Sequence, residues 1–101
     1  MSFYGLMSDR LPGTRLFATD DGGTHWRYIG DRLPNPEGLH LNGLTLGAQG
    51  QVLHIAAELG VVFSSSDGGV SWRRGETGYN GHLYGVLPLA GADGREALLA
   101  Y

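Results

Sequence analysis

A short phrase occurs twice in this 101-residue chain, and its spacing constrains the fold more than any other feature. The first copy, TDDGGTHW, begins at Thr19, and the second, SSDGGVSW, begins at Ser65, 46 residues later. The shared pattern is Thr/Ser-x-Asp-x-Gly-x-x-Trp, with an apolar pair before it and an arginine after it. A repeat period of this size is typical of solenoids and propellers, in which each repeat is one small unit of secondary structure.

Short apolar runs flank each copy of the phrase, which predicts a β-hairpin around it. Runs of four to eight apolar residues bounded by Gly, Asp, Asn and Pro are typical of strands. We therefore predict one pair of strands at residues 14–19 and 24–29 and a second pair at 61–66 and 70–74. The Asp-Gly step of each phrase falls in the turn, where residues that tolerate a positive φ are favoured.

Two more pairs of apolar runs complete the pattern. Residues 40–46 and 51–58 precede the second hairpin, and residues 82–87 and 96–101 echo them at the end of the chain. The proline-containing segment 31–38 carries the extra residues of the first copy, so we predict a surface loop there.

Four strands in about 40 residues match one blade of a β-propeller. We therefore predict an all-β fold of four-stranded antiparallel blades, about two per chain, with half-blades at the termini. Residues 1–30 would form the second half of one blade, 39–75 a complete blade, and 81–101 the first half of another. Two blades cannot close a ring, so the chain is either part of a longer propeller or assembles head to tail with further copies of itself.

Two glycines, Gly43 and Gly85, fall at matching places inside predicted strands. A glycine in a strand indicates a β-bulge or the close approach of another backbone. The alternative is a cofactor packed on the glycine.

Composition excludes several classes of function. The net charge is −3 and the seven basic residues, all Arg, form no stripe that could neutralise nucleic-acid phosphates. No apolar run approaches the roughly 20 residues that a membrane-spanning helix requires, and the start of the chain lacks the pattern of a signal peptide. We therefore expect a soluble chain. The absence of cysteine excludes disulfides and thiolate chemistry but leaves the compartment open.

The repeated phrase resembles the Asp-box, or BNR repeat, in the version found in photosystem II assembly and stability factors. The tracts GHLYGVL, from Gly81, and ALLAY, from Ala97, add to that likeness. The resemblance implies a structural turn between the third and fourth strands of each blade, on the face away from the ligand site. The residues it assigns to this structural role are Thr19, Asp21, Gly23, Trp26, Ser65, Asp67, Gly69 and Trp72.

Candidate ligand residues lie elsewhere. His40 and His82 begin the innermost strands of the predicted blades and would approach a central channel, and Tyr79 is the best exposed aromatic residue of a loop. The full set for this channel face is His40, Asn42, Tyr79, His82 and Tyr84. The histidines lack zinc-ligand spacing and the acidic turns lack the EF-hand ligand pattern, so we predict no metal and no cofactor.

The sequence contains no recognisable catalytic motif, and we predict that the protein is not an enzyme. There is no Gly-x-Ser-x-Gly elbow, and no pair of carboxylates suggests a glycosidase. The first hypothesis is a scaffold that binds proteins or peptides, as the resemblance to assembly factors implies. Alternatives are a carbohydrate-binding or sialidase- or glycosidase-derived propeller segment, because sialidases and some glycanases carry the same box, and a structural repeat without a ligand. The resemblance also suggests a periplasmic or other extracytoplasmic location.

Overall fold

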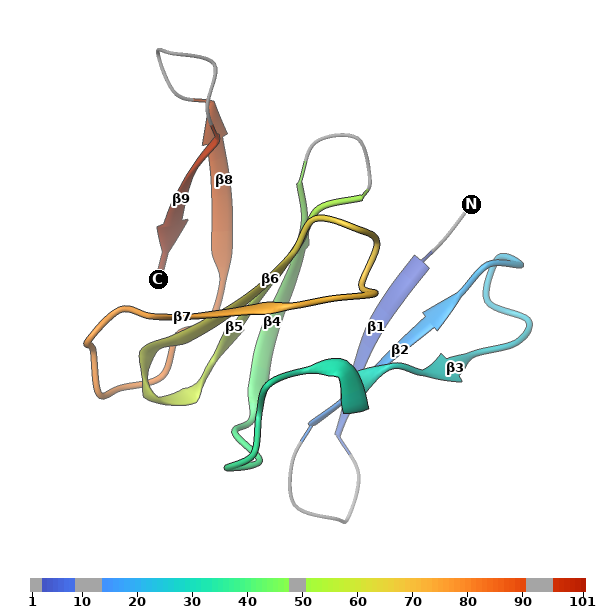
Figure 1. Ribbon diagram of the computed structural model, residues 1–101, viewed down its shortest axis with the longest axis horizontal. Helices are drawn as coiled ribbons and strands as arrows, with labels where there is room; N and C mark the ends of the chain where they lie inside the picture. The colour runs from blue at the N-terminus through green and yellow to red at the C-terminus, as the bar shows by residue number, and fades with distance from the viewer. Residues whose placement is uncertain (1–2, 9–13, 48–50, 91–95) are drawn as a thin grey trace.

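The computed structural model describes residues 3–8, 14–47, 51–90 and 96–101, and it consists of three antiparallel β-sheets (Figure 1). The strand orders are β1-β2-β3, β4-β5-β6-β7 and β8-β9. The bounds are β1 Phe3–Ser8, β2 Thr14–Thr19, β3 Arg27–Tyr28, β4 Leu41–Leu46, β5 Leu53–Ala57, β6 Val61–Ser65, β7 Arg73–Glu76, β8 Val86–Ala90 and β9 Glu96–Ala100. Two 3₁₀ turns, η1 (Gly30–Arg32) and η3 (Glu58–Gly60), are the helical segments of the described residues, so the predicted all-β class is confirmed.

The middle sheet contains the four strands predicted between residues 39 and 75, joined in sequence order. The first sheet has three strands, because β1 pairs along its whole length with β2, from Phe3 opposite Thr19 to Ser8 opposite Thr14. The last sheet has two. Within the described residues the three sheets remain open and do not close into a ring (Figure 1).

The strand after each repeated phrase begins later than predicted. β3 covers only Arg27–Tyr28 instead of residues 24–29, and β7 starts at Arg73 instead of residue 70. The reason is local: the residues that follow the Asp-Gly-Gly step fold back onto the turn, so their backbone is not available for pairing with the preceding strand. β8 also starts later than predicted, at Val86 instead of residue 82. The segment before it is bonded to the middle sheet, where Leu83 donates its N–H to the Ala57 carbonyl.

The core lies between the first and middle sheets. Its buried residues include Leu16, Ile29, Ile55 and Phe63, and Trp72 packs against their edge. A smaller cluster of Ala56, Leu83 and Val86 joins the middle sheet to the last one. None of the helical segments in the described ranges is long or apolar enough for a membrane span.

The backbone around Gly43 confirms the expected bulge and close approach. The pairing of β4 with β5 shifts register between Leu41 and Gly43. A Cβ on Gly43 would clash with the Tyr84 carbonyl oxygen and lie 3.3 Å from the Gly85 Cα. A backbone, not a cofactor, thus occupies the space above this glycine. At Gly85 the neighbour is the ring of Tyr101.

The two ends of the middle sheet hold different sets of residues. At one end Gly68, in the second repeated phrase, donates its N–H to the Gln51 carbonyl. At the other end Glu58 donates its N–H to the His40 carbonyl, which places the η3 turn beside the start of β4. The second repeated phrase and His40, one of the candidate channel residues, therefore lie at opposite ends of this sheet.

Candidate functional site

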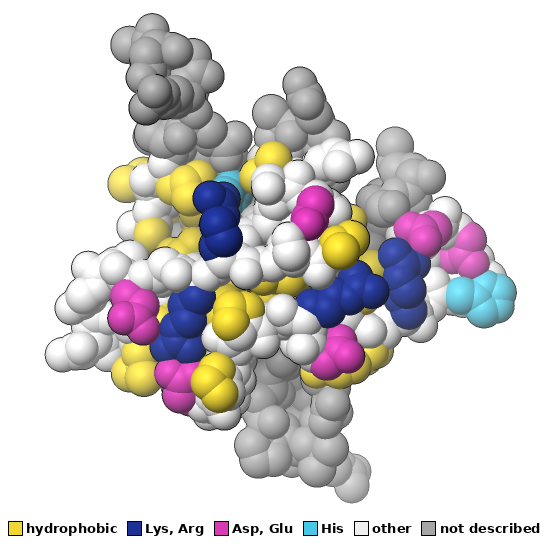
Figure 2. Space-filling model, in the orientation of Figure 1, with side chains coloured by type: hydrophobic (Ala, Val, Ile, Leu, Met, Phe, Trp, Pro, Cys, Tyr) yellow, Lys and Arg dark blue, Asp and Glu magenta, His cyan; other side chains and the backbone are white. Residues whose placement is uncertain are grey.

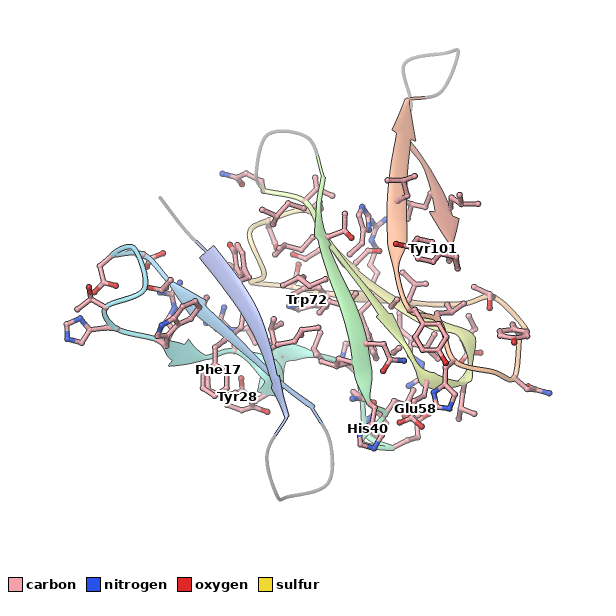
Figure 3. The ribbon with its side chains drawn as sticks, turned by 180° about the vertical axis from the view of Figure 1, so that it is seen from behind. Phe17, Tyr28, His40, Glu58, Trp72 and Tyr101 are labelled. Atoms are coloured by element: carbon pink, nitrogen blue, oxygen red, sulfur yellow. The ribbon has the colours of Figure 1, made fainter. Side chains whose placement is uncertain are left out.

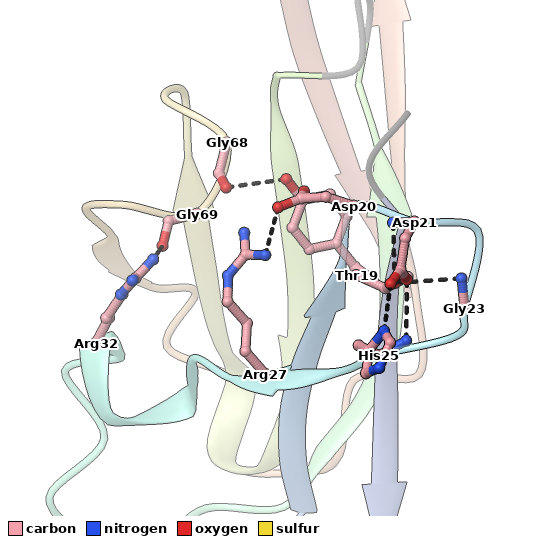
Figure 4. Close-up of polar contacts among 10 residues, drawn as sticks. Thr19, Asp20, Asp21, Gly23, His25, Arg27, Arg32, Gly68 and Gly69 are labelled. Carbon is pink, nitrogen blue, oxygen red and sulfur yellow. Dashed lines mark hydrogen bonds and ion pairs between the residues drawn. The ribbon is translucent and has the colours of Figure 1, made fainter.

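The first repeated phrase, here called Asp turn 1 (residues 19–26), is closed by its own side chains (Figure 4). The Thr19 hydroxyl donates to the Asp21 carboxylate at 2.7 Å and accepts the Gly23 N–H at 3.2 Å. Asp21 also accepts the backbone N–H of His25 at 2.9 Å and lies 2.7 Å from its ring. The Trp26 ring donates its N–H to the Gly23 carbonyl at 2.9 Å.

Asp turn 2 (residues 65–72) repeats this network almost bond for bond. The Ser65 hydroxyl donates to Asp67 at 2.8 Å and accepts the Gly69 N–H at 2.9 Å, and Trp72 donates to the Gly69 carbonyl at 3.0 Å. Ser71 takes the place of His25 and donates both its N–H and its hydroxyl to Asp67. The carboxylates are thus held inside their own turns, where they stabilise a hairpin.

Hydrogen bonds to the carboxylates hold both aspartates in the charged form. The pKa of Asp21 is lowered to about 2, first by the backbone N–H of His25 and then by the Thr19 hydroxyl. The pKa of Asp67 is lowered to about 2, first by the Ser71 hydroxyl and then by its backbone N–H. A low pKa of this origin reflects turn stabilisation and is opposite to the raised pKa that a general acid needs.

Asp turn 2 also receives hydrogen bonds from two side chains outside the middle sheet, one on β1 and one on the η1 turn. The Tyr4 hydroxyl donates to the Gly68 carbonyl at 2.9 Å, and the Arg32 guanidinium donates to the Gly69 carbonyl at 3.2 Å (Figure 4). Gly69 is packed beside Ile29 as well. This turn therefore joins neighbouring sheets in addition to closing its own hairpin.

At the other end of the middle sheet, His40 and Glu58 lie together (Figure 3). Glu58 accepts the backbone N–H of His40, and its carboxylate lies 3.8 Å from the His40 ring. The Asn42 amide donates to the Leu83 carbonyl at 2.9 Å, so it holds the segment before β8 against β4. Both candidates from the channel face thus make contacts within the protein at this end.

The other three channel candidates line one hollow of about 460 Å³, here called the tyrosine hollow. Its lining residues are Thr77, Tyr79, His82, Leu83, Tyr84, Ala100 and Tyr101. Tyr79, Tyr84 and Tyr101 are 59%, 67% and 65% exposed, and the His82 and Tyr84 rings lie 6.4 Å apart. Sequence reasoning missed Tyr101, which it assigned to a strand by pattern. The Tyr101 N–H and carbonyl both pair with Gly85, which brings the end of β9 to the hollow.

Two of these tyrosine rings lie directly against a glycine. A Cβ on Gly81 would lie 2.5 Å from the ring of Tyr79, and one on Gly85 would lie 2.5 Å from the ring of Tyr101. Each ring thus covers a glycine. Gly60 is likewise closed over by the Tyr79 backbone and donates its N–H to the Gly81 carbonyl. The segment that carries the tyrosines is therefore well supported.

Arg74 has a role that the sequence did not reveal. Arg74 forms a two-bond ion pair with Glu37, at 2.7 and 2.6 Å, and also donates to the Pro34 carbonyl. The guanidinium lowers the pKa of Glu37 to about 2. This pair anchors the predicted surface loop 31–38 to β7. Figure 2 shows arginine and acidic side chains next to each other over the face it presents.

The described residues contain no group of three His, Asp or Glu side chains placed to hold a metal ion. What the tyrosine hollow offers is exposed aromatic surface with hydroxyl groups, a combination that is enriched where proteins bind one another.

A comparison with curated proteins gives one match. The chain is 39% identical over 56 residues to the photosystem II assembly lipoprotein Ycf48 of Synechococcus sp. (strain CC9902). The aligned stretch covers 55% of this chain and 16% of that protein. No family model matches the chain, and no solved structure matches it.

Proposed function

We propose that this chain is a non-catalytic protein-binding module built from β-propeller blades. The likeness to Ycf48, which is named as an assembly protein, supports an assembly or binding role. The four-stranded order β4-β5-β6-β7 and the two matching Asp turns favour blades of the Asp-box type. Because Ycf48 is named as a lipoprotein, a place outside the cytoplasm fits the same proposal.

The tyrosine hollow is the observation that carries the proposal. Tyrosine is enriched where proteins bind one another, because its ring supplies apolar area and its hydroxyl a hydrogen bond. Three exposed tyrosines converge on one hollow at the end of the middle sheet away from Asp turn 2. The binding partner we propose is therefore a protein or peptide, and the Asp-turn residues serve the fold.

A second part of the proposal concerns the open sheets. Unpaired strand edges favour association with further strands, supplied by other copies of the chain or by more blades of a longer one. Native mass spectrometry of the 101-residue chain tests self-association. A well-folded monomer at all concentrations would contradict it.

Selection from a random peptide library displayed on phage tests the binding function, with a glycan array as the contrasting screen. We expect selected peptides to bind the parent chain and to lose binding to a Tyr84→Ala variant. Val70→Ala, which shortens an exposed apolar side chain outside the hollow, is the control and should keep binding. Failure to select any peptide, together with reproducible sugar binding, would refute the proposal.

A further inference from the structure

The tyrosine hollow is lined by aromatic, aliphatic and hydroxyl-bearing side chains. Its seven lining residues include no Lys, Arg, Asp or Glu. Burying a charged side chain of a partner there would cost free energy, because the lining has no Lys, Arg, Asp or Glu side chain that could pair with it. The hollow therefore suits an uncharged segment.

Three oxygen atoms of the lining already accept hydrogen bonds within the protein. The Thr77 hydroxyl donates to the Gly60 carbonyl at 2.9 Å and accepts the Tyr79 N–H at 3.2 Å. The Leu83 carbonyl accepts from Asn42, and the Tyr101 carbonyl accepts the Gly85 N–H at 3.0 Å. These three oxygen atoms are therefore less available to the N–H groups of a ligand than they would be if unbonded.

The donors, by contrast, remain available. Within the described part of the chain, none of the hydroxyls of Tyr79, Tyr84 and Tyr101 is hydrogen-bonded to the protein. A phenolic hydroxyl can donate one hydrogen bond. Proline residues have a carbonyl acceptor and no N–H, and a polyproline II helix leaves its carbonyls without internal partners. Its hydrogen-bonding groups thus match those of the hollow.

Rigidity points to the same ligand. Tyr79 and Tyr101 lie over Gly81 and Gly85, so little reordering of these rings is needed on binding. Stiff aromatic walls and a stiff, preformed peptide helix together keep the entropy cost of association low.

We propose that the tyrosine hollow binds an uncharged, proline-rich peptide segment in the polyproline II conformation. The proposal rests on the protein-binding function above and specifies its ligand. The tyrosine rings contact the proline rings, and the tyrosine hydroxyls donate to the peptide carbonyls.

Fluorescence anisotropy with a labelled polyproline peptide of about ten residues tests this, since such a peptide is helical before it binds. The comparison peptide has the same length with alanine in place of proline. We expect the proline peptide to bind more tightly. Tyr84→Ala should weaken it about tenfold or more, as for a central aromatic contact. Tyr84→Phe should weaken it about fivefold, the value of one hydrogen bond. Tyr28→Phe, which removes a tyrosine hydroxyl on β3 outside the hollow, is the control and should leave affinity unchanged.

Equal binding of the two peptides, or an unchanged affinity in Tyr84→Phe, would overturn the proposal. Tyr84→Phe keeps the ring, so a loss of fold cannot explain its effect, and circular dichroism verifies this. If phage selection yields peptides without proline that still depend on Tyr84, the ligand class is wrong while the binding function stands. If no peptide binds at all, both are wrong.

Discussion

Replacing Gly43 with alanine should unfold the joint between the middle and last sheets. The added methyl group would overlap the Tyr84 carbonyl oxygen and lie 3.2 Å from its carbon, whereas ordinary contacts begin at 3.4 Å. To relieve the overlap, the two backbones must separate by roughly 1 Å, since a packed interior leaves no void to absorb the methyl group.

That separation breaks the bonds that fasten the segment before β8. The Asn42–Leu83 bond is 2.9 Å long and the bond from the Leu83 N–H to the Ala57 carbonyl is 3.2 Å long, so an additional ångström exceeds hydrogen-bonding range for both. At about 1 kcal/mol each, plus the strain of overpacking, we expect Gly43→Ala to lower the free energy of unfolding by about 3 kcal/mol.

Urea denaturation followed by tryptophan fluorescence measures this loss, with Gly75→Ala as the matched control. Gly75 lies in β7 of the same sheet, and a Cβ there would meet only the Val62 carbonyl, at an ordinary 3.7 Å. Alanine at such a place should be neutral or stabilise by about 0.5 kcal/mol, because it restricts the unfolded chain. If Gly43→Ala proves as stable as Gly75→Ala, the close approach of the two backbones is not real and the reasoning fails.

Three further predictions concern the turns. Ser65→Ala should cost about 1–3 kcal/mol in urea denaturation, because it leaves the Gly69 N–H without its acceptor in a buried site; an unchanged midpoint would contradict the turn network. Leu59→Gly should not destabilise the protein and should raise its unfolding free energy by up to about 1 kcal/mol, because Leu59 is 55% exposed with a φ of 57°; a clear loss would show that its side chain matters to the fold. The pKa of both Asp21 and Asp67 is lowered to about 2, whereas the pKa in the unfolded chain is about 4. The two carboxylates therefore contribute fully to the free energy of unfolding above a pH of about 4, and this contribution is lost as the pH falls through about 2. The melting temperature of the parent chain should fall as the pH is lowered from 6 to 2, and that of Asp67→Asn should fall less steeply. The same pH dependence in both chains would contradict a stabilising role of the charged Asp67.

The hairpins could be predicted because their turns are specified locally. Thr19 and Asp21 close Asp turn 1 within a few residues, and β2 ends where the pattern placed it. The late start of β7 was missed although its cause is also local, because an apolar strand pattern does not show that Ser71 bonds back to Asp67. The close approach at Gly43 was predictable in kind, because a glycine within a strand needs a physical reason.

The candidate site was predictable only in part. Tyr79, His82 and Tyr84 are close in sequence, so their grouping in one hollow follows from a single loop. Tyr101 joins them through backbone pairing with Gly85, a contact that no local pattern encodes. The Arg74–Glu37 ion pair is equally non-local, because 37 residues separate its partners. Tertiary packing decides such contacts, and side-chain type alone does not reveal them.

The bonds from Tyr4 and Arg32 to Asp turn 2 end on the carbonyls of Gly68 and Gly69. Every residue has a main-chain carbonyl, so these two hydrogen bonds do not depend on which side chains the accepting turn carries. Substitutions that preserve the path of the turn will therefore leave the joint intact, while a substitution of either donor will weaken it. A lineage of such repeats can diverge in the accepting turn and still stack, provided that the donors of the preceding repeat persist.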